Sequence, residues 1–179
     1  MAACTNFTLV LTGCESTGKT TLATQLASHF DVPLVPEVAR LMMSPGEPYG
    51  EKLVLEIAKQ QNKAEVNLRR KTPGLLIADT DLSVIYIWCQ NKFGHVDPWL
   101  VRQFQQQSER QYLLMSPDLT WVEDPLRESQ TEIPGLHKQY QTLLKRHDLR
   151  FEKIHGEGQS RFNKALSFVE KWMLSDNGG

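Results

Sequence analysis

Hydrophobic residues along the chain form short continuous runs that alternate with longer stretches of helical spacing. The runs predict strands at residues 7–12, 33–36, 75–78, 112–115 and 150–154. Apolar side chains that recur every three or four residues predict helices at residues 19–30, 53–70, 82–92, 98–110, 135–147 and 160–174. Strands that are apolar throughout and alternate with helices are typical of a parallel sheet covered on both faces. The sequence therefore predicts an α/β fold.

Length and composition restrict the class of protein. The 179 residues suit one domain spanning residues 1–179, with a frayed tail at 175–179. A net charge of -1 does not favour nucleic acid as a partner, and no apolar run approaches the ~20 residues needed to cross a membrane. Three widely spaced cysteines predict reduced thiols rather than disulfides or a zinc site. Without a signal peptide at the N-terminus, we expect a cytoplasmic protein.

One motif carries a specific chemistry. Residues 13–20 read G-C-E-S-T-G-K-T, with an apolar strand before them and an amphipathic helix after them, which is the context that a phosphate-binding loop requires. The glycines let the backbone wrap a phosphate, Lys19 can bridge the β and γ phosphates, and the Thr20 hydroxyl suits a magnesium ion. The predicted ATP-binding residues are Gly13, Glu15, Ser16, Thr17, Gly18, Lys19, Thr20 and Thr21.

Carboxylates follow the third predicted strand. Asp79 and Asp81 stand where that strand ends, and a carboxylate at this edge of a parallel sheet can hold magnesium or accept a proton from an attacking hydroxyl. We predict such a role for Asp79, together with Thr20 as a magnesium ligand. For Asp81 a capping role at the next helix explains the residue equally well.

Other candidates for binding an acceptor molecule lie nearby in the chain. Glu37 and Arg40 suit the hydroxyls or the phosphate side of a substrate, although an exposed ion pair on a helix is the alternative. Trp88 and Trp121, like Tyr86, can stack on a flat ring, but aromatic side chains in such positions are more often part of the core.

A charged segment follows the fourth predicted strand. In kinases of this size such a segment forms a mobile lid, whose arginine neutralises charge on the phosphoryl group in transfer. We predict a short helical lid at residues 121–134, with Arg127 as this arginine and Arg110 in reserve. The alternative is a solvated charged loop.

Together these residues resemble the nicotinamide riboside (ribosylnicotinamide) kinase domain of NadR-type proteins, a group within the P-loop kinases and AAA-type ATPases. The resemblance runs from Leu9 to Met173 and rests on residues 13–23 (GCESTGKTTLA), 37–40 (EVAR), 77–94 (IADTDLSVIYIWCQNKFG), 121–127 (WVEDPLR) and 161–165 (RFNKA). It implies a five-stranded parallel sheet and transfer of the ATP γ-phosphoryl group to the 5′-hydroxyl of the ribose.

The same resemblance implies roles for single residues. It makes Asp79 the acid/base or magnesium-organising carboxylate and puts Arg127 on the phosphates. Near the ribosyl substrate or the lid it puts Glu37, Arg40, Asp81, Trp121 and Asp124. Pro125 departs from the family pattern and is expected to stiffen the lid entrance.

The sequence thus predicts a magnesium-dependent kinase that uses ATP and acts on a small nucleoside, with no nucleic acid and no membrane as a partner. Many relatives carry an adenylyltransferase domain before the kinase, and we expect this chain to have neither that activity nor a DNA-binding segment. The alternatives are a kinase for another nucleoside or small metabolite, or a regulatory ATPase that binds ATP without transferring phosphate.

Overall fold

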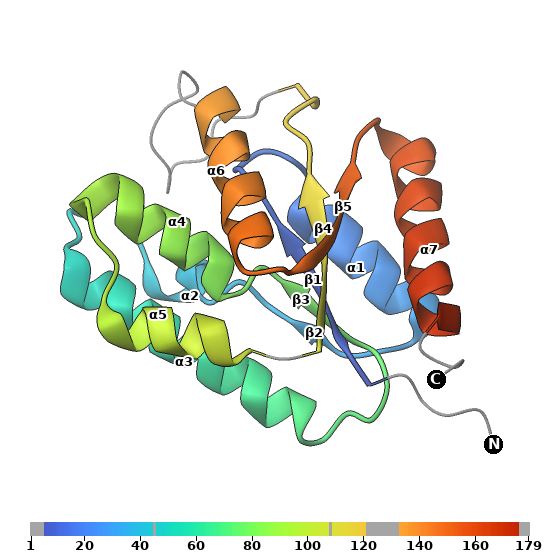
Figure 1. Cartoon of the computed structure of the whole chain (residues 1–179), viewed down its shortest axis with the longest axis horizontal. Coiled ribbons are helices and arrows are strands. Elements are labelled where there is room, and N and C mark those ends of the chain that lie inside the picture. Colours follow the sequence, from blue (N-terminus) through green and yellow to red (C-terminus); the bar gives the residue numbers. More distant parts are fainter. Residues whose placement is uncertain (1–5, 45, 108, 121–132, 176–179) are drawn as a thin grey trace.

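The computed structural model describes residues 6–44, 46–107, 109–120 and 133–175. These residues form one five-stranded sheet in which all the paired strands are parallel and the order is β2-β3-β1-β4-β5 (Figure 1). The strands are β1 (Thr8–Thr12), β2 (Leu34–Val35), β3 (Leu76–Asp79), β4 (Arg110–Met115) and β5 (Arg150–Ile154). The helices are α1 (Lys19–Phe30), α2 (Ala39–Met42), α3 (Glu51–Arg69), α4 (Leu82–Phe93), α5 (Pro98–Gln106), α6 (Ile133–Arg146) and α7 (Gly158–Ser175). The α/β fold predicted from the sequence is confirmed.

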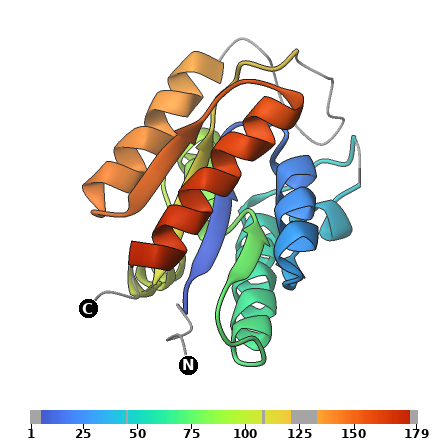
Figure 2. The same cartoon turned by 90° about the vertical axis from the view of Figure 1, so that its right-hand side faces the viewer.

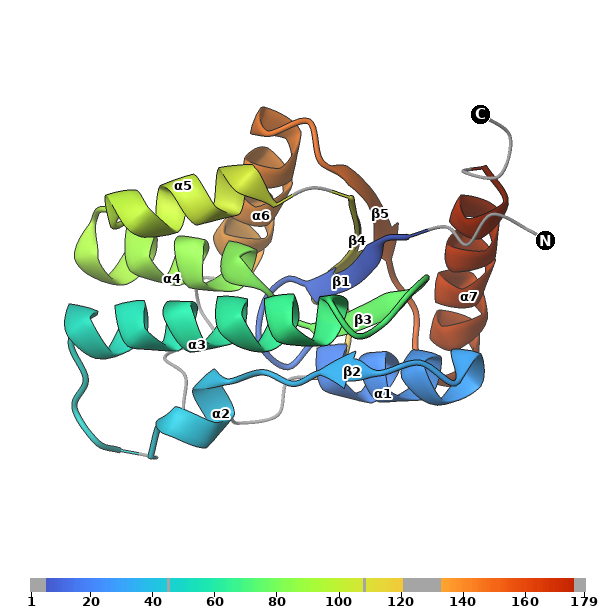
Figure 3. The ribbon, with the colours of Figure 1, turned by 90° about the horizontal axis from the view of Figure 1, so that it is seen from below.

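Helices cover both faces of the sheet and produce two hydrophobic cores. On one face, α1 and α7 pack over Leu9 and Leu11 of β1. On the other, α3, α4, α5 and α6 pack over Val10 of the same strand. Figure 3 shows these two groups of helices on either side of the strands, and Figure 2 shows α7 crossing in front of the sheet beside α1. Because β1 is covered on both faces, its apolar run has no polar alternation.

The boundary between α5 and β4 differs from the prediction. The predicted helix at 98–110 ends at Gln106, and Arg110 already belongs to a strand that was expected to begin at Tyr112. Parallel pairing of Arg110 with Thr8 causes the difference, since a polar residue gives no local sign that it will join a buried strand. The short helix α2 was also not predicted.

The described cysteines are buried and make no disulfide. Burial raises the pKa of the Cys89 thiol to about 11, so this thiol stays protonated near neutral pH. Cys14 lies in the phosphate loop with no exposed surface. Cys4 lies outside the described residues. Within the described ranges, no helix is both long enough and apolar enough to cross a membrane.

Candidate functional site

The loop between β1 and α1 depends on left-handed backbone at three positions. Gly13 has a φ of 127°, Ser16 of 53° and Gly18 of 77°. Gly13 also lies against β4, because a Cβ on this residue would come within 2.9 Å of the Met115 carbonyl oxygen. Glycine alone tolerates both conditions. In a loop that curves in this way, successive backbone N–H groups can turn inward and bind the oxygens of a phosphate.

Lys19 begins α1, and its side chain is folded back over the loop. Its Nζ donates hydrogen bonds to the carbonyl oxygens of Gly13 at 3.0 Å and Cys14 at 2.6 Å. The Thr17 hydroxyl donates to the same Cys14 oxygen at 2.8 Å. The N-cap, Gly18, has no side chain to bind the first N–H groups of α1. A buried ammonium and a helix amino end therefore meet at the loop, and both favour an anion.

Asp79 lies at the same edge of the sheet, because β3 pairs with β1 in a register that sets Asp79 opposite Leu11. The residue is 2% exposed, and its Oδ1 finds no hydrogen-bond partner in the described part of the chain. Burial raises the pKa of Asp79, a hydrogen bond with the Thr20 side chain lowers it, and the charge of Glu37 raises it. Overall, the pKa of Asp79 is raised above its ordinary value.

Thr20 and Asp79 are therefore neighbours, and both offer oxygen atoms. No group of three or more His, Cys, Asp or Glu side chains among the described residues forms a metal site. This donor set fits magnesium, which keeps several water molecules and takes only one or two protein carboxylates alongside substrate phosphates.

A cavity of about 290 Å³ lies among α2, α3, α4 and α6. Glu15 of the phosphate loop and Thr80, next to Asp79, belong to its wall. Three of the predicted substrate residues, Glu37, Arg40 and Trp88, line it as well. The structure thus brings residues from four separate segments to one cavity beside the phosphate loop.

Glu37 and Arg40 form an ion pair at the mouth of this space. The Arg40 Nε donates to the Glu37 Oε2 at 2.9 Å, and the Arg40 side chain is 45% exposed whereas that of Glu37 is 4% exposed. Gln61 of α3 holds the preceding backbone, since its side chain accepts from the Val38 N–H at 2.9 Å and donates to the Pro36 carbonyl at 3.2 Å. The ion pair is therefore exposed on its arginine side and buried on its carboxylate side.

Aromatic side chains form another part of the cavity wall. Trp88 and Tyr49 meet edge to face with ring centroids 5.3 Å apart, and the Trp88 Nε1 donates to the Tyr49 hydroxyl at 3.2 Å. The Nζ of Lys92 lies 3.8 Å from the centroid of the Tyr49 ring. Sequence reasoning missed Tyr49, which follows a turn-rich segment without periodicity. Tyr86 instead packs against Phe104 in the core.

Asp81 lies apart from the cavity lining and caps α4. It has no exposed surface, and its Oδ1 accepts from the Ser83 N–H at 2.8 Å. Its Oδ2 accepts from the Tyr112 hydroxyl at 2.9 Å and lies 3.9 Å from the Arg110 Nη1. Arg110 is also bound to Glu65, so its guanidinium belongs to a buried network and is not the reserve arginine for phosphate. The structure matches the capping alternative for Asp81.

The remaining candidate residues are those of the predicted lid. Trp121, Asp124 and Arg127 lie outside the described residues, as does the lid as far as residue 132. The predicted lid residues 133 and 134 belong to the start of α6.

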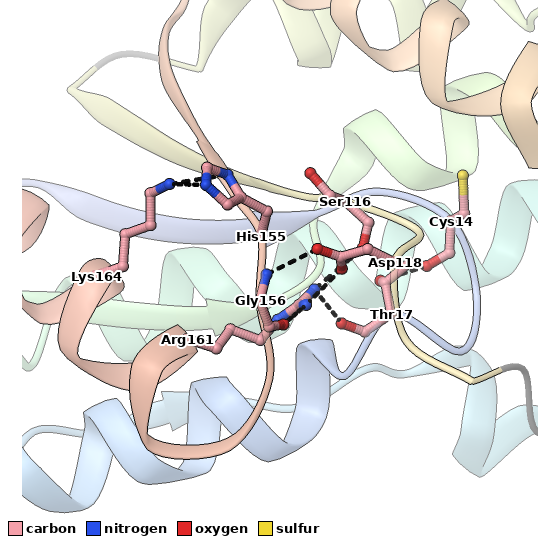
Figure 4. Close-up of polar contacts among 8 residues, drawn as sticks. All are labelled: Cys14, Thr17, Ser116, Asp118, His155, Gly156, Arg161 and Lys164. Atoms are coloured by element: carbon pink, nitrogen blue, oxygen red, sulfur yellow. Dashed lines mark hydrogen bonds and ion pairs between the residues drawn. The ribbon is translucent and has the colours of Figure 1, made fainter.

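Arg161 joins three segments behind the phosphate loop (Figure 4). Its Nη2 donates to the carbonyl oxygens of Thr17 at 2.8 Å and Ser116 at 3.1 Å. Its Nη1 donates to the Asp118 Oδ1 at 2.8 Å and the Gly156 carbonyl at 2.5 Å. Burial raises the pKa of Asp118, but hydrogen bonds from Arg161 and the Gly156 N–H outweigh this effect and lower it overall. One guanidinium thus fixes the loops that follow β1, β4 and β5. Residues 161–165 contributed to the family resemblance, but this role of Arg161 was not predicted.

The chain is similar to known proteins in sequence and in structure. A family model described as an AAA domain matches residues 8–161, and no curated protein matches the chain. A NadR protein solved in complex with NR superimposes with a TM-score of 0.81 at 19% identity, covering 94% of this chain and 52% of the other. This chain therefore spans about half the length of that protein.

Two complete kinases share the same fold. Thymidylate kinase from Ehrlichia chaffeensis superimposes with a TM-score of 0.65 at 14% identity, over 93% of this chain and 98% of the kinase. Deoxyadenosine kinase from M. mycoides superimposes with a TM-score of 0.66 at 11% identity, over 92% of this chain and 100% of the kinase. At such identities the likeness establishes a P-loop kinase fold.

Replacing Asp81 tests its structural role. Asp81→Ala removes a cap and leaves the buried Arg110 with one carboxylate fewer, so we expect the free energy of unfolding to fall by about 3–5 kcal/mol. Asp97→Ala is the matched control, because Asp97 caps α5 in a half-buried position by accepting from the Trp99 N–H at 2.7 Å. That loss should be about 1 kcal/mol. Equal losses in urea unfolding would contradict the buried network.

A second variant tests the guanidinium behind the phosphate loop. Arg161→Lys keeps the charge but cannot reproduce four hydrogen bonds in a fixed planar arrangement, so the Thr17 carbonyl loses its partner. We expect affinity for ATP to fall roughly tenfold, which equals about 1.4 kcal/mol. Arg102→Lys, on the exposed surface of α5, is the control and should bind ATP normally. Equilibrium binding of ATP to both variants and the wild type gives the answer, and unchanged affinity in Arg161→Lys would refute the role.

Proposed function

This chain belongs to the AAA domain family, and on that premise we propose that it is a small-molecule kinase that transfers the γ-phosphoryl group of ATP to a nucleoside. One observation carries the proposal. The buried carboxylate of Asp79, the phosphate loop and the wall of a cavity adjoin at one edge of the sheet. A protein that only hydrolysed ATP would need no such space for a second molecule. The cavity therefore favours phosphoryl transfer over the regulatory ATPase.

ATP would bind with its phosphates in the loop of residues 13–20. The backbone N–H groups and the amino end of α1 supply positive potential there, and Lys19 exchanges its carbonyl partners for phosphate oxygens. Arg127 would reach the same phosphates from the lid. Thr20 and Asp79 would hold magnesium, and the ion would neutralise part of the phosphate charge.

The acceptor would occupy the cavity with its reactive hydroxyl toward Asp79. Nicotinamide riboside suits this space, because Trp88 and Tyr49 offer aromatic surface for a flat ring and Glu37 offers a buried carboxylate for sugar hydroxyls. The likeness to a NadR protein solved with NR supports the choice. Kinases of other nucleosides share the fold, and they are the second candidate.

The proposed reaction is an in-line displacement. The 5′-hydroxyl oxygen forms a bond to the γ-phosphorus while the bond from that phosphorus to the β,γ-bridging oxygen breaks, and ADP leaves. Asp79 orients the hydroxyl and takes its proton, a task for which a raised pKa is suited. The products are nicotinamide mononucleotide and ADP, with the proton finally released to solvent.

A transfer assay tests the function directly. Labelled ATP is incubated with the full chain, magnesium and a panel of nucleosides that includes nicotinamide riboside. We expect label in nicotinamide mononucleotide, and a turnover loss of at least about 10³-fold in Lys19→Ala, since its ammonium meets the phosphates. Label in a different nucleotide would show that the chain is a kinase of another nucleoside, the second candidate. Release of inorganic phosphate alone, whatever nucleoside is present, would exclude a kinase.

Asp79→Asn separates catalysis from stability. We expect turnover to fall by about 10²–10⁴-fold, and to fall more than the affinity for ATP, because the carboxylate acts on the acceptor hydroxyl as well as on magnesium. A folded-state pKa above the unfolded one means that the ionised carboxylate costs stability near neutral pH, a cost that disappears as the pH falls through the raised pKa. The amide avoids this cost, so the variant should melt no lower than the wild type at pH 7. Lower melting with normal turnover would show Asp79 to be structural.

A further inference from the structure

Thr80 has a backbone conformation that its residue type resists. Its φ is 79°, whereas a side chain branched at Cβ rarely enters the left-handed region. The other described non-glycine residues with positive φ are Ser16, Asp31, Glu109 and Asp148, none of them branched at Cβ. The two flanking residues enforce the turn. Asp79 is still paired with β1, and Asp81 already caps α4. The Thr80 N–H donates to the Leu11 carbonyl at 3.1 Å, which fixes the turn further.

The hydroxyl of Thr80 adds a second cost. The residue is 2% exposed, and its Oγ1 makes no hydrogen bond within the described part of the chain. A buried hydroxyl without a partner destabilises a fold, and such groups are uncommon in native proteins. Glycine at this position would remove the strain and the unpaired hydroxyl together. Thr80 therefore combines backbone strain with an unpaired buried hydroxyl. Such costs are typical of functional sites, where binding of a ligand compensates for them.

The place of Thr80 identifies that ligand. Thr80 lines the cavity that we assign to the acceptor, and it directly follows Asp79, which we assign to the reacting hydroxyl. Other groups on the wall already have partners, such as Glu37 with Arg40 and Trp88 with Tyr49. A hydroxyl both donates and accepts, so its natural complement is another hydroxyl.

We propose that Thr80 is a specificity-determining residue whose Oγ1 hydrogen-bonds a sugar hydroxyl of the acceptor, next to the oxygen that receives the phosphoryl group. This inference rests on the proposed kinase function and deepens it. It assigns the acceptor to the hydroxylated sugars, because a site with an unpaired hydrogen-bonding group discriminates against an analogue that cannot satisfy that group.

Three substitutions at this one position test the proposal. Thr80→Gly relieves the strain and deletes the hydroxyl, so it should melt no lower than the wild type while its KM for the acceptor rises about tenfold. Thr80→Ser keeps the hydroxyl and should hold that KM within about threefold of the wild type. Thr80→Val keeps the shape without the hydroxyl and should match Thr80→Gly in KM, even if it is less stable. The KM for ATP should stay unchanged in all three.

Asp148→Gly provides the matched control. Asp148 also has a positive φ, of 50°, but it is exposed between α6 and β5. This variant relieves backbone strain without touching the cavity, so its KM for the acceptor should equal that of the wild type. A rise in the acceptor KM that Asp148→Gly shares would reflect general loosening of the chain and would overturn the role of Thr80.

The outcomes also separate this inference from the proposed function. If the wild-type chain phosphorylates a nucleoside but the acceptor KM is unchanged in Thr80→Gly and Thr80→Val, the proposed role of Thr80 is refuted. The kinase function is then unaffected. A wild-type chain that neither phosphorylates nor binds any nucleoside of the panel by calorimetry would refute both. A raised acceptor KM in those two variants, restored by serine, supports the proposal.

Discussion

A backbone loop whose N–H groups turn toward an anion must also have partners for its own carbonyl oxygens. In this protein those partners determine how the phosphate loop is held against the rest of the fold. Lys19 and Thr17 bind the Cys14 oxygen from within the loop, while Arg161 binds the Thr17 oxygen from the far end of the chain. Gly13 lets the loop approach the end of β4. Side chains from α1 and α7 therefore hold the loop in its curved conformation, and these two helices lie side by side on one face of the sheet.

The acceptor side of the site depends on the opposite face. There α3 fixes the segment after β2 through Gln61, and Asp81 caps the start of α4. Arg110 binds Glu65 of α3 and lies near Asp81, so α3 and α4, which both line the cavity, are linked by one buried ionic network. The phosphate loop is thus held by helices on one face and the acceptor cavity is lined by helices on the other, and the two adjoin where β1 and β3 end.

Sequence patterns predicted what is encoded locally. Three features can be recognised within a few residues: the apolar run of β1, the glycines around Lys19 and the carboxylate that ends β3. The sheet and the phosphate loop could therefore be predicted from them. Arg161 and Gln61 act through contacts with segments far away in the chain, and no local spacing reveals a pairing of that kind. The same reason explains the misplaced start of β4, where Arg110 looks like the end of a surface helix until its partners Glu65 and Thr8 are known.

The strand order also bears on how the chain folds as it is made. β1 leaves the ribosome first but lies at the centre of the sheet, and its neighbours β3 and β4 end at Asp79 and Met115. At translation speeds of about 5–20 residues per second, β1 waits for roughly 5–20 seconds before both partners are available. During that time its apolar side chains have no sheet to join. The nascent amino-terminal segment is therefore the part of this chain most in need of a chaperone.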